Sequence, residues 1–163
     1  MQALKRHAVP LAVVTAILVG VAATGAWLWS HMGEDHLLRA DDPVVLALGQ
    51  RVYAAHCAAC HGADGQGQPN WRERGPGGLL PAPPHDASGH TWHHPDRQLF
   101  AITKHGVAKV IGDPDYTSAM PAYAGVLSDD EIIAALSWIK SRWPPAVRAQ
   151  QERLDREARH AGR

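Results

Sequence analysis

The sequence predicts an all-α protein in which a small helical domain follows a membrane-spanning helix. Three observations lead to this fold class. The stretch Ala8–Ser30 holds no charged residue, three later segments repeat apolar residues at helical spacing, and no segment alternates apolar and polar residues as a half-buried strand does. The chain therefore divides into an N-terminal signal-anchor helix at 1–33, a domain at 41–143 and a charged tail at 144–163.

The N-terminal segment is long enough to cross a membrane. Lys5 and Arg6 precede 23 uncharged positions, and about 20 apolar residues cross a bilayer core as a helix. Trp27 and Trp29 close the stretch, where aromatic rings favour the membrane interface. Because positive charge ahead of the span keeps the N-terminus in the cytoplasm, we expect a single-pass protein of a bacterial inner membrane with its later domain in the periplasm.

The alternative for this segment is a cleaved signal peptide. Such peptides have an apolar region of about 7–15 residues and a small-residue cleavage site. The stretch here is longer, and its one candidate site, near Thr24-Gly25-Ala26, is a poor match. Cleavage would leave the domain soluble in the periplasm.

Composition excludes several classes of protein. The 163 residues carry 16 Lys+Arg, 16 Asp+Glu and only two Cys, which rules out a disulfide-dense scaffold and gives no basic footprint for nucleic acid. The zero net charge is segregated into +2 over 1–33, −4 over 34–145 and +2 over 146–163. A mildly acidic exported domain favours a partner with a basic patch.

The first helix of the domain is expected to begin at Asp42-Pro43. Asp is a favourable N-cap, and Pro fits the first helical position. Gly49 and Tyr53 lie four positions apart, on one face of that helix. A second helix is expected at 95–105, with Gly106 as its C-terminal stop.

The last helix of the domain is the clearest of the three. Ser128 and Glu131 make a capping box, and an apolar stripe follows at helical spacing, through Ile132, Leu136, Ile139 and Trp143. The run 62–91 is rich in Gly, Pro and His and has no period. So long a loop is unusual in a compact domain, unless it wraps something that is not protein.

The tail after Pro144-Pro145 is expected to form a solvated helix. Opposite charges recur at i,i+4 spacing, in the pairs Arg148/Glu152, Glu152/Arg156, Arg153/Glu157 and Asp155/Arg159. Leu154 is nearly its only large apolar residue, so no apolar face predicts packing against the domain.

The chemistry is expected in Cys57-Ala58-Ala59-Cys60-His61, a covalent haem-attachment sequence. The two thiols of such a motif add to the vinyl groups of the porphyrin, and the adjacent His binds the iron from the proximal side. The only two cysteines of the chain lie in this motif. A thioredoxin-type redox pair needs a βαβ context, and a zinc site needs a second pair of ligands; the sequence predicts neither.

The iron needs a second axial ligand, which a methionine supplies in many electron-transfer haems. Met1 begins the chain and Met32 precedes the haem motif, so Met120 is the favoured distal ligand. Pro121 biases Met120 toward an extended backbone, which suits a side chain that reaches inward from a loop. The alternative is a bis-His haem, with its distal ligand drawn from His85, His90, His93, His94 and His105.

In this order, the motifs resemble those of class I c-type cytochromes over 41–143. Gly49-x-x-x-Tyr53 stands before the Cys-x-x-Cys-His motif, as in the N-terminal helix of that family. Met120-Pro121 resembles the Met-Pro of its distal loop. Trp138 stands in the last helix at the place of the aromatic residue that packs on the first helix.

The resemblance implies a cytochrome c fold with one haem c, bound covalently by Cys57 and Cys60 and ligated by His61 and Met120. It also implies that a proline carbonyl receives the His61 ring N–H, the candidates being Pro76, Pro81 and Pro83. Members of the family transfer single electrons and are not enzymes in their own right.

We therefore expect a membrane-tethered carrier that relays electrons between respiratory or other exported redox proteins, or serves as a subunit of a membrane oxidase or dehydrogenase complex. The alternative is a ligand-reactive haem protein, peroxidase-like or gas-sensing, with an open or bis-His distal site. A smaller hypothesis is a second metal, such as copper, at His90, His93 and His94; such clusters are more often solvated or pocket residues.

Overall fold

The computed structural model describes residues 20–21, 24 and 36–162. The chain divides into two compact units, residues 1–35 and 36–163. None of the described helices has the length and hydropathy that a membrane span requires. The predicted span at 8–30 lies, apart from three positions, outside the described residues, so the membrane anchor stays a prediction.

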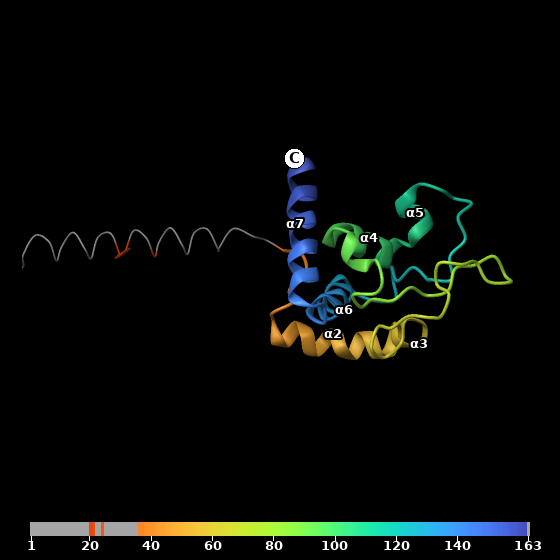
Figure 1. Cartoon of the computed structure of the whole chain (residues 1–163), viewed down its shortest axis with the longest axis horizontal. Coiled ribbons are helices and arrows are strands. Elements are labelled where there is room, and N and C mark those ends of the chain that lie inside the picture. The colour runs from red at the N-terminus through yellow and green to blue at the C-terminus, as the bar shows by residue number, and fades with distance from the viewer. Residues whose placement is uncertain (1–19, 22–23, 25–35, 163) are drawn as a thin grey trace, which may run out of the picture. The chain divides into compact units, whose positions relative to one another are not determined.

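The described part of the second unit is helical, in agreement with the predicted all-α class. Its elements in chain order are α2 (Pro43–His56), α3 (Ala58–His61), the short 3₁₀ helix η1 (Thr91–His93), α4 (Asp96–His105), α5 (Val107–Ile111), α6 (Asp129–Ser141) and α7 (Pro145–Ala161) (Figure 1). Within that part, the only β pairing is an isolated bridge between Ala124 and Leu127.

The helix ends follow the caps that the sequence predicts. The Asp42 side chain accepts two backbone N–H groups at the start of α2, and Pro43 is the first residue of that helix. Ser128 and Glu131 form the complete capping box of α6. Gly106 ends α4 with φ +84°, a left-handed value that glycine adopts without a steric cost. Sequence reasoning missed α3 and α5, which are too short to show a period.

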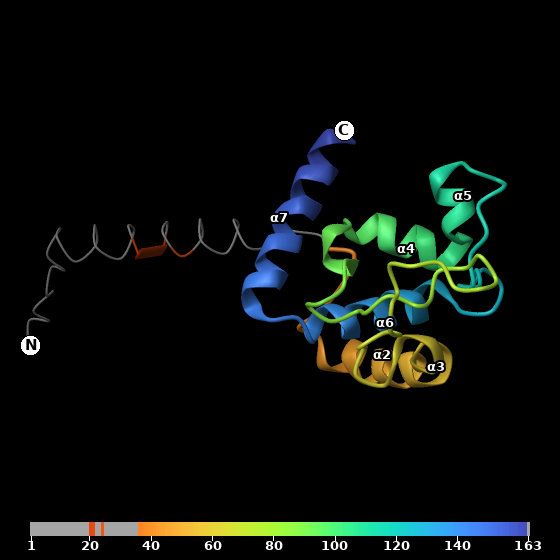
Figure 2. The same cartoon turned by 45° about the vertical axis from the view of Figure 1, so that its right-hand side comes forward.

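Helices α2 and α6 make the most extensive helix–helix contact of the unit and lie side by side in Figures 1 and 2. A Cβ atom at Gly49 would lie 2.0 Å from the carbonyl oxygen of Ala134, so only glycine fits at this crossing. One turn later, the rings of Tyr53 and Trp138 pack 4.5 Å apart. The predicted contact of the Gly49/Tyr53 face with Trp138 is therefore confirmed.

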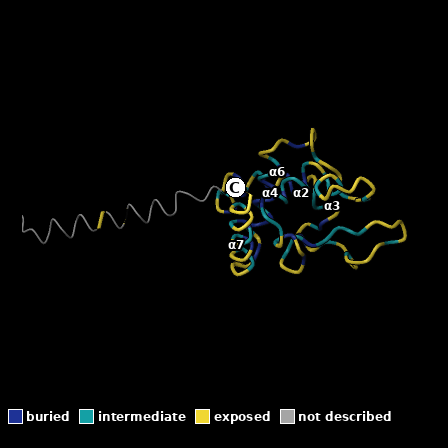
Figure 3. The backbone as a smooth tube through the Cα atoms, turned by 90° about the horizontal axis from the view of Figure 1, so that it is seen from above, coloured by how far each residue is buried: buried dark blue, intermediate teal, exposed yellow. Residues whose placement is uncertain are grey.

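The apolar core is small and lies where α2, α4 and α6 meet, which Figure 3 shows as the buried centre of the unit. Its buried members are Leu38, Val52, Tyr53, Leu99, Leu127, Ile132, Ala135, Leu136, Ile139 and Trp143. All four residues of the predicted α6 stripe are among them. The long loop between α3 and η1 is mostly exposed or half-buried, so it adds little to this core.

The C-terminal helix α7 packs on the unit instead of lying free in solvent. Gln151 and Asp155 are fully buried. The predicted helix is confirmed, and two predicted pairs form, Arg148–Glu152 at 3.0 Å and Arg159–Asp155 at 3.5 Å, but the expected solvation is wrong. Apolar periodicity missed the contact because α7 docks largely through polar side chains, which leave no apolar stripe to detect.

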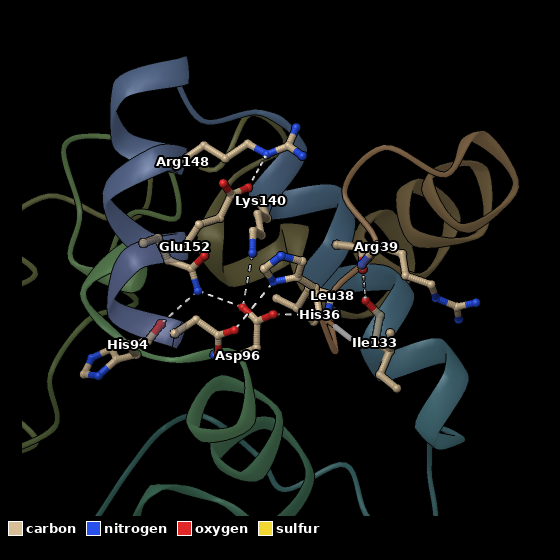
Figure 4. A network of polar contacts seen from close by, with 12 residues as sticks. His36, Leu38, Arg39, His94, Asp96, Ile133, Lys140, Arg148 and Glu152 are labelled. Carbon is tan, nitrogen blue, oxygen red and sulfur yellow. Dashed lines mark hydrogen bonds and ion pairs between the residues drawn. The ribbon is translucent and has the colours of Figure 1, made fainter. Parts of the chain in front are cut away.

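A buried polar network joins α7 to α4, α6 and the segment before α2 (Figure 4). Its centre is Asp96, which is 1% exposed. The Asp96 carboxylate accepts hydrogen bonds from Leu38 N–H at 3.2 Å, Gln151 Nε2 at 2.7 Å and Lys140 Nζ at 3.4 Å. The Asp96 N–H donates to Asp155 Oδ1 at 3.0 Å. Lys140 supplies the cation that a buried carboxylate requires.

Replacing Lys140 by alanine is expected to destabilise the holoprotein by about 3–5 kcal/mol, because it leaves Asp96 buried without its cation. Urea unfolding followed by circular dichroism measures this loss. Lys104→Ala is the matched control: Lys104 pairs with Asp129, whose side chain is 57% exposed, and exposed pairs contribute about 0–1 kcal/mol. Equal losses in the two variants would contradict the role given to the network.

Candidate functional site

The Cys-x-x-Cys-His motif lies where α2 passes into α3. Cys57 is the residue between the two helices; its N–H donates to the carbonyl of Tyr53, and it serves as the N-cap of α3. Cys57 is half-buried, Cys60 is exposed, and the two form no disulfide. His61 ends α3 and is buried, at 7% exposure. The short helix α3 and its N-cap residue thus carry both thiols and the imidazole.

The electrostatics of Cys57 do not suit a redox dithiol. Burial, with a smaller effect of Cys60, raises the pKa of the Cys57 thiol to about 11. Reactive Cys-x-x-Cys pairs need a thiol pKa lowered well below its usual value, because the thiolate is the nucleophile. The protonated Cys57 and the helical fold argue against the thioredoxin-type alternative.

The ring of His61 is oriented by one backbone hydrogen bond. Its Nδ1 donates to the carbonyl of Pro83 at 2.8 Å, so of the three proline candidates the structure selects Pro83. A proton on Nδ1 leaves the lone pair of the neutral ring on Nε2, the atom that is then able to bind a metal. Burial lowers the pKa of His61, and the hydrogen bond to Pro83 opposes that shift, so the ring is neutral at pH 7.

Two close approaches hold the Pro83 carbonyl in place. A Cβ atom at Gly67 would lie 2.4 Å from Pro84 N, and one at Gly89 would lie 2.0 Å from Pro84 O. Pro84 is therefore packed between two glycine backbones, and its neighbour Pro83 has little room to move. From the sequence, these glycines indicated only that the long loop lacks a period. In the structure, they allow two parts of the loop backbone to pack closely against each other.

Met120 lies in the loop between α5 and α6 and is half-buried, and its N–H donates to Ser118 Oγ at 3.1 Å. Tyr123, three residues later, fastens this loop to the haem motif. Its hydroxyl donates to the carbonyl of His56 at 2.6 Å, directly before Cys57, and its N–H donates to Thr103 O at 3.1 Å. The structure thus ties the Met120 loop to the end of α2. Sequence reasoning missed Tyr123, which no motif marks.

Three of the other candidate histidines each stack on a neighbouring ring. His85 stacks on His61 with ring centroids 3.9 Å apart. His90 stacks on Trp71 and His93 on Trp92.

Among the described residues, the one group of at least three side chains close enough to share a metal ion is His36, Asp96 and Asp155, not the predicted cluster of His90, His93 and His94. The carboxylates of Asp96 and Asp155 already face the cations of Lys140 and Arg159. We therefore assign no metal to that group.

Replacing Gly89 by alanine is expected to displace Pro84 and with it the carbonyl that holds His61. Overpacking of this kind costs about 1–3 kcal/mol. Urea unfolding of the holoprotein measures the loss, and the fraction of chain with attached haem measures the effect on the site. Gly75→Ala is the control, because its Cβ would meet only Leu79 O at an ordinary 3.7 Å. A Gly89→Ala protein as stable as the Gly75→Ala control would show that Pro84 is not held tightly.

The donor set fits a covalent haem. Two reduced thiols and a buried imidazole with a free Nε2 lone pair lie within five residues, and a carbonyl fixes the ring from the other side. When bound, haem c supplies an iron that takes up and releases one electron. The residues of this chain provide its covalent attachment and orient its ligand.

Comparison with known proteins agrees with this site. The cytochrome c family model matches residues 46–143. Comparisons with the curated proteins and with the solved structures gave no significant match. The family match includes the whole Cys-x-x-Cys-His motif and the Met120 loop. Because it spans more than half of the chain, this protein belongs to the cytochrome c family: it is a class I c-type cytochrome that binds covalent haem c, and its family consists in general of electron carriers.

Proposed function

We propose that the protein is a membrane-tethered one-electron carrier in which Cys57 and Cys60 form the haem thioethers and His61 and Met120 ligate the iron. The observation that carries the proposal is the hydrogen bond from His61 Nδ1 to Pro83, at 2.8 Å. It leaves Nε2 as the metal-binding atom and strengthens the imidazole as a donor. Thioether ligation by Met120 favours ferrous iron and raises the reduction potential.

Two observations support Met120 over His85 as the distal ligand. The hydroxyl of Tyr123 fastens the Met120 loop to His56, at the end of α2 that bears the motif. His85 contacts the face of the His61 ring. A ligand opposite His61 must lie across the iron, and a ring stacked on His61 does not.

A carrier with two protein ligands has no open iron position for a substrate, which distinguishes it from the ligand-reactive alternative. The test is the absorption spectrum of the purified ferric and ferrous holoprotein, with and without carbon monoxide. Wild-type protein is expected to show the thioether-to-iron charge-transfer band and to bind carbon monoxide slowly or not at all.

Met120→Ala is expected to lose the charge-transfer band, to bind carbon monoxide rapidly and to have a lower reduction potential, because an open position replaces the thioether. His105→Ala is the control for the bis-His alternative, and should keep the band. Absence of the band from the wild-type protein, or rapid carbon monoxide binding by it, would favour the ligand-reactive haem protein.

We further propose that residues 8–30 stay in a bacterial inner membrane and that the haem domain works in the periplasm. The partners are exported redox proteins or a membrane oxidase or dehydrogenase complex. A tether raises the effective concentration of partners in the same membrane. The net charge of −4 over 34–145 favours a partner with a basic patch at the contact.

The full-length protein is expected in the membrane fraction with its N-terminal sequence intact. N-terminal sequencing of the holoprotein from separated membrane and periplasmic fractions measures this. The control replaces residues 1–35 by a cleavable export signal, and should move the protein to the soluble periplasmic fraction with an unchanged spectrum. A mature N-terminus close to Ala26 in the full-length protein would establish a cleaved signal peptide instead.

A further inference from the structure

His85 makes a contact that the proposed function does not use. Its ring lies face to face with that of His61, with centroids 3.9 Å apart and an interplanar angle of 23°. It is two residues beyond Pro83, whose carbonyl holds the same imidazole. Two nearby positions of the loop thus contact His61, one through a hydrogen bond at its edge and one across its face.

The proton on His85 is placed by a chain of hydrogen bonds. The buried Thr91 donates its hydroxyl to Pro84 O at 3.4 Å, so its oxygen accepts from His85 Nδ1 at 2.9 Å. This direction places a hydrogen on His85 Nδ1. The face of the held ring lies against His61, so the surface that His61 meets is flat.

The backbone of His85 is held as firmly as its side chain. Its N–H donates to Gly65 O at 2.7 Å. Its carbonyl accepts from Trp143 Nε1 at 2.7 Å, and Trp143 is 4% exposed. Backbone and ring are thus fixed by three different segments: the loop after the motif, the start of η1 and the turn that follows α6.

One hydrogen bond does not fix the plane of an imidazole. The bond from His61 Nδ1 to Pro83 sets the direction of one ring atom, and the ring can still swing about that direction. A second flat ring at contact distance removes this freedom, because a tilt of His61 would bring it into His85. The two contacts together determine both the direction and the plane of the ligand.

We propose that His85 is a positioning residue that fixes the ring plane of the proximal iron ligand. The proposal rests on ligation by His61, as proposed above. The plane of an axial imidazole decides which iron d orbital it bonds with, and so how the unpaired electron of ferric iron spreads over the porphyrin. The flat shape of His85 is what matters, and its charge plays no part.

The test compares the His85→Leu, His85→Phe and Thr91→Val holoproteins with the wild type. The measurement is the pattern of hyperfine-shifted haem-methyl proton resonances of the ferric protein, supported by its electron paramagnetic resonance spectrum. His85→Leu removes the flat surface and is expected to change the order or spread of the methyl resonances. His85→Phe retains a flat ring but loses the bond to Thr91 Oγ1, so it is expected to shift the pattern no more than Thr91→Val does. Thr91→Val frees the His85 ring and is expected to shift the pattern in the same direction as leucine, by less.

If His85 had a purely structural role, its variants would be less stable, but the haem-methyl resonances of His85→Leu and His85→Phe would not differ in this way. An unchanged methyl pattern in His85→Leu, or equal changes in both of these proteins, would overturn the proposal. If His85→Leu does not accumulate, an unchanged pattern in Thr91→Val overturns it.

The wild-type spectrum separates failure of this proposal from failure of the proposed function. If the wild-type protein has a low-spin ferric haem with a histidine ligand, and every variant retains the wild-type haem-methyl pattern, only the positioning role is refuted. A wild-type spectrum that shows no histidine bound to the iron refutes the ligation by His61, and the positioning role with it. A high-spin spectrum with a histidine ligand refutes only the ligation by Met120.

Discussion

The hydrogen bond from His61 Nδ1 to the Pro83 carbonyl joins the haem-attachment motif to the long loop that follows it. Helix α3 carries His61, and the long aperiodic loop carries Pro83. The loop reaches this position only because its backbone packs against itself at Gly67 and Gly89, where any side chain would collide with Pro84. So long a loop is unusual in a domain with a small apolar core, and we propose that the porphyrin is what this loop covers.

The segments outside the family match are fastened to the haem domain by polar contacts. Leu38 and Ala40 precede the matched range and are buried, and α7 follows it. Both extensions meet at Asp96, which accepts from Leu38 N–H and from Gln151, and Arg148 of α7 pairs with Asp41. The described segment that precedes the family match is thus part of the folded unit from His36 onward.

Much of the fold could be predicted because its helices end in local signals. Asp42-Pro43, Gly106 and the capping box of Ser128 and Glu131 lie at helix ends in the structure, and each acts through hydrogen bonds or backbone conformations within a few residues. The docking of α7 could not be predicted in this way. By residue type, Gln151 and Asp155 are expected at the surface. They are buried because each forms a hydrogen bond with Asp96, which lies 55 and 59 positions earlier in the chain.

The same division holds for the site. The covalent chemistry is predicted from the sequence alone, because Cys57, Cys60 and His61 lie within five residues at the spacing of a haem-attachment motif. The roles of Pro83, whose carbonyl orients His61, and of His85, which covers its face, are visible only in the folded chain. Those contacts join residues 22 and 24 positions apart through a loop without period. Their geometry depends on how closely that loop packs, which local residue preferences do not specify.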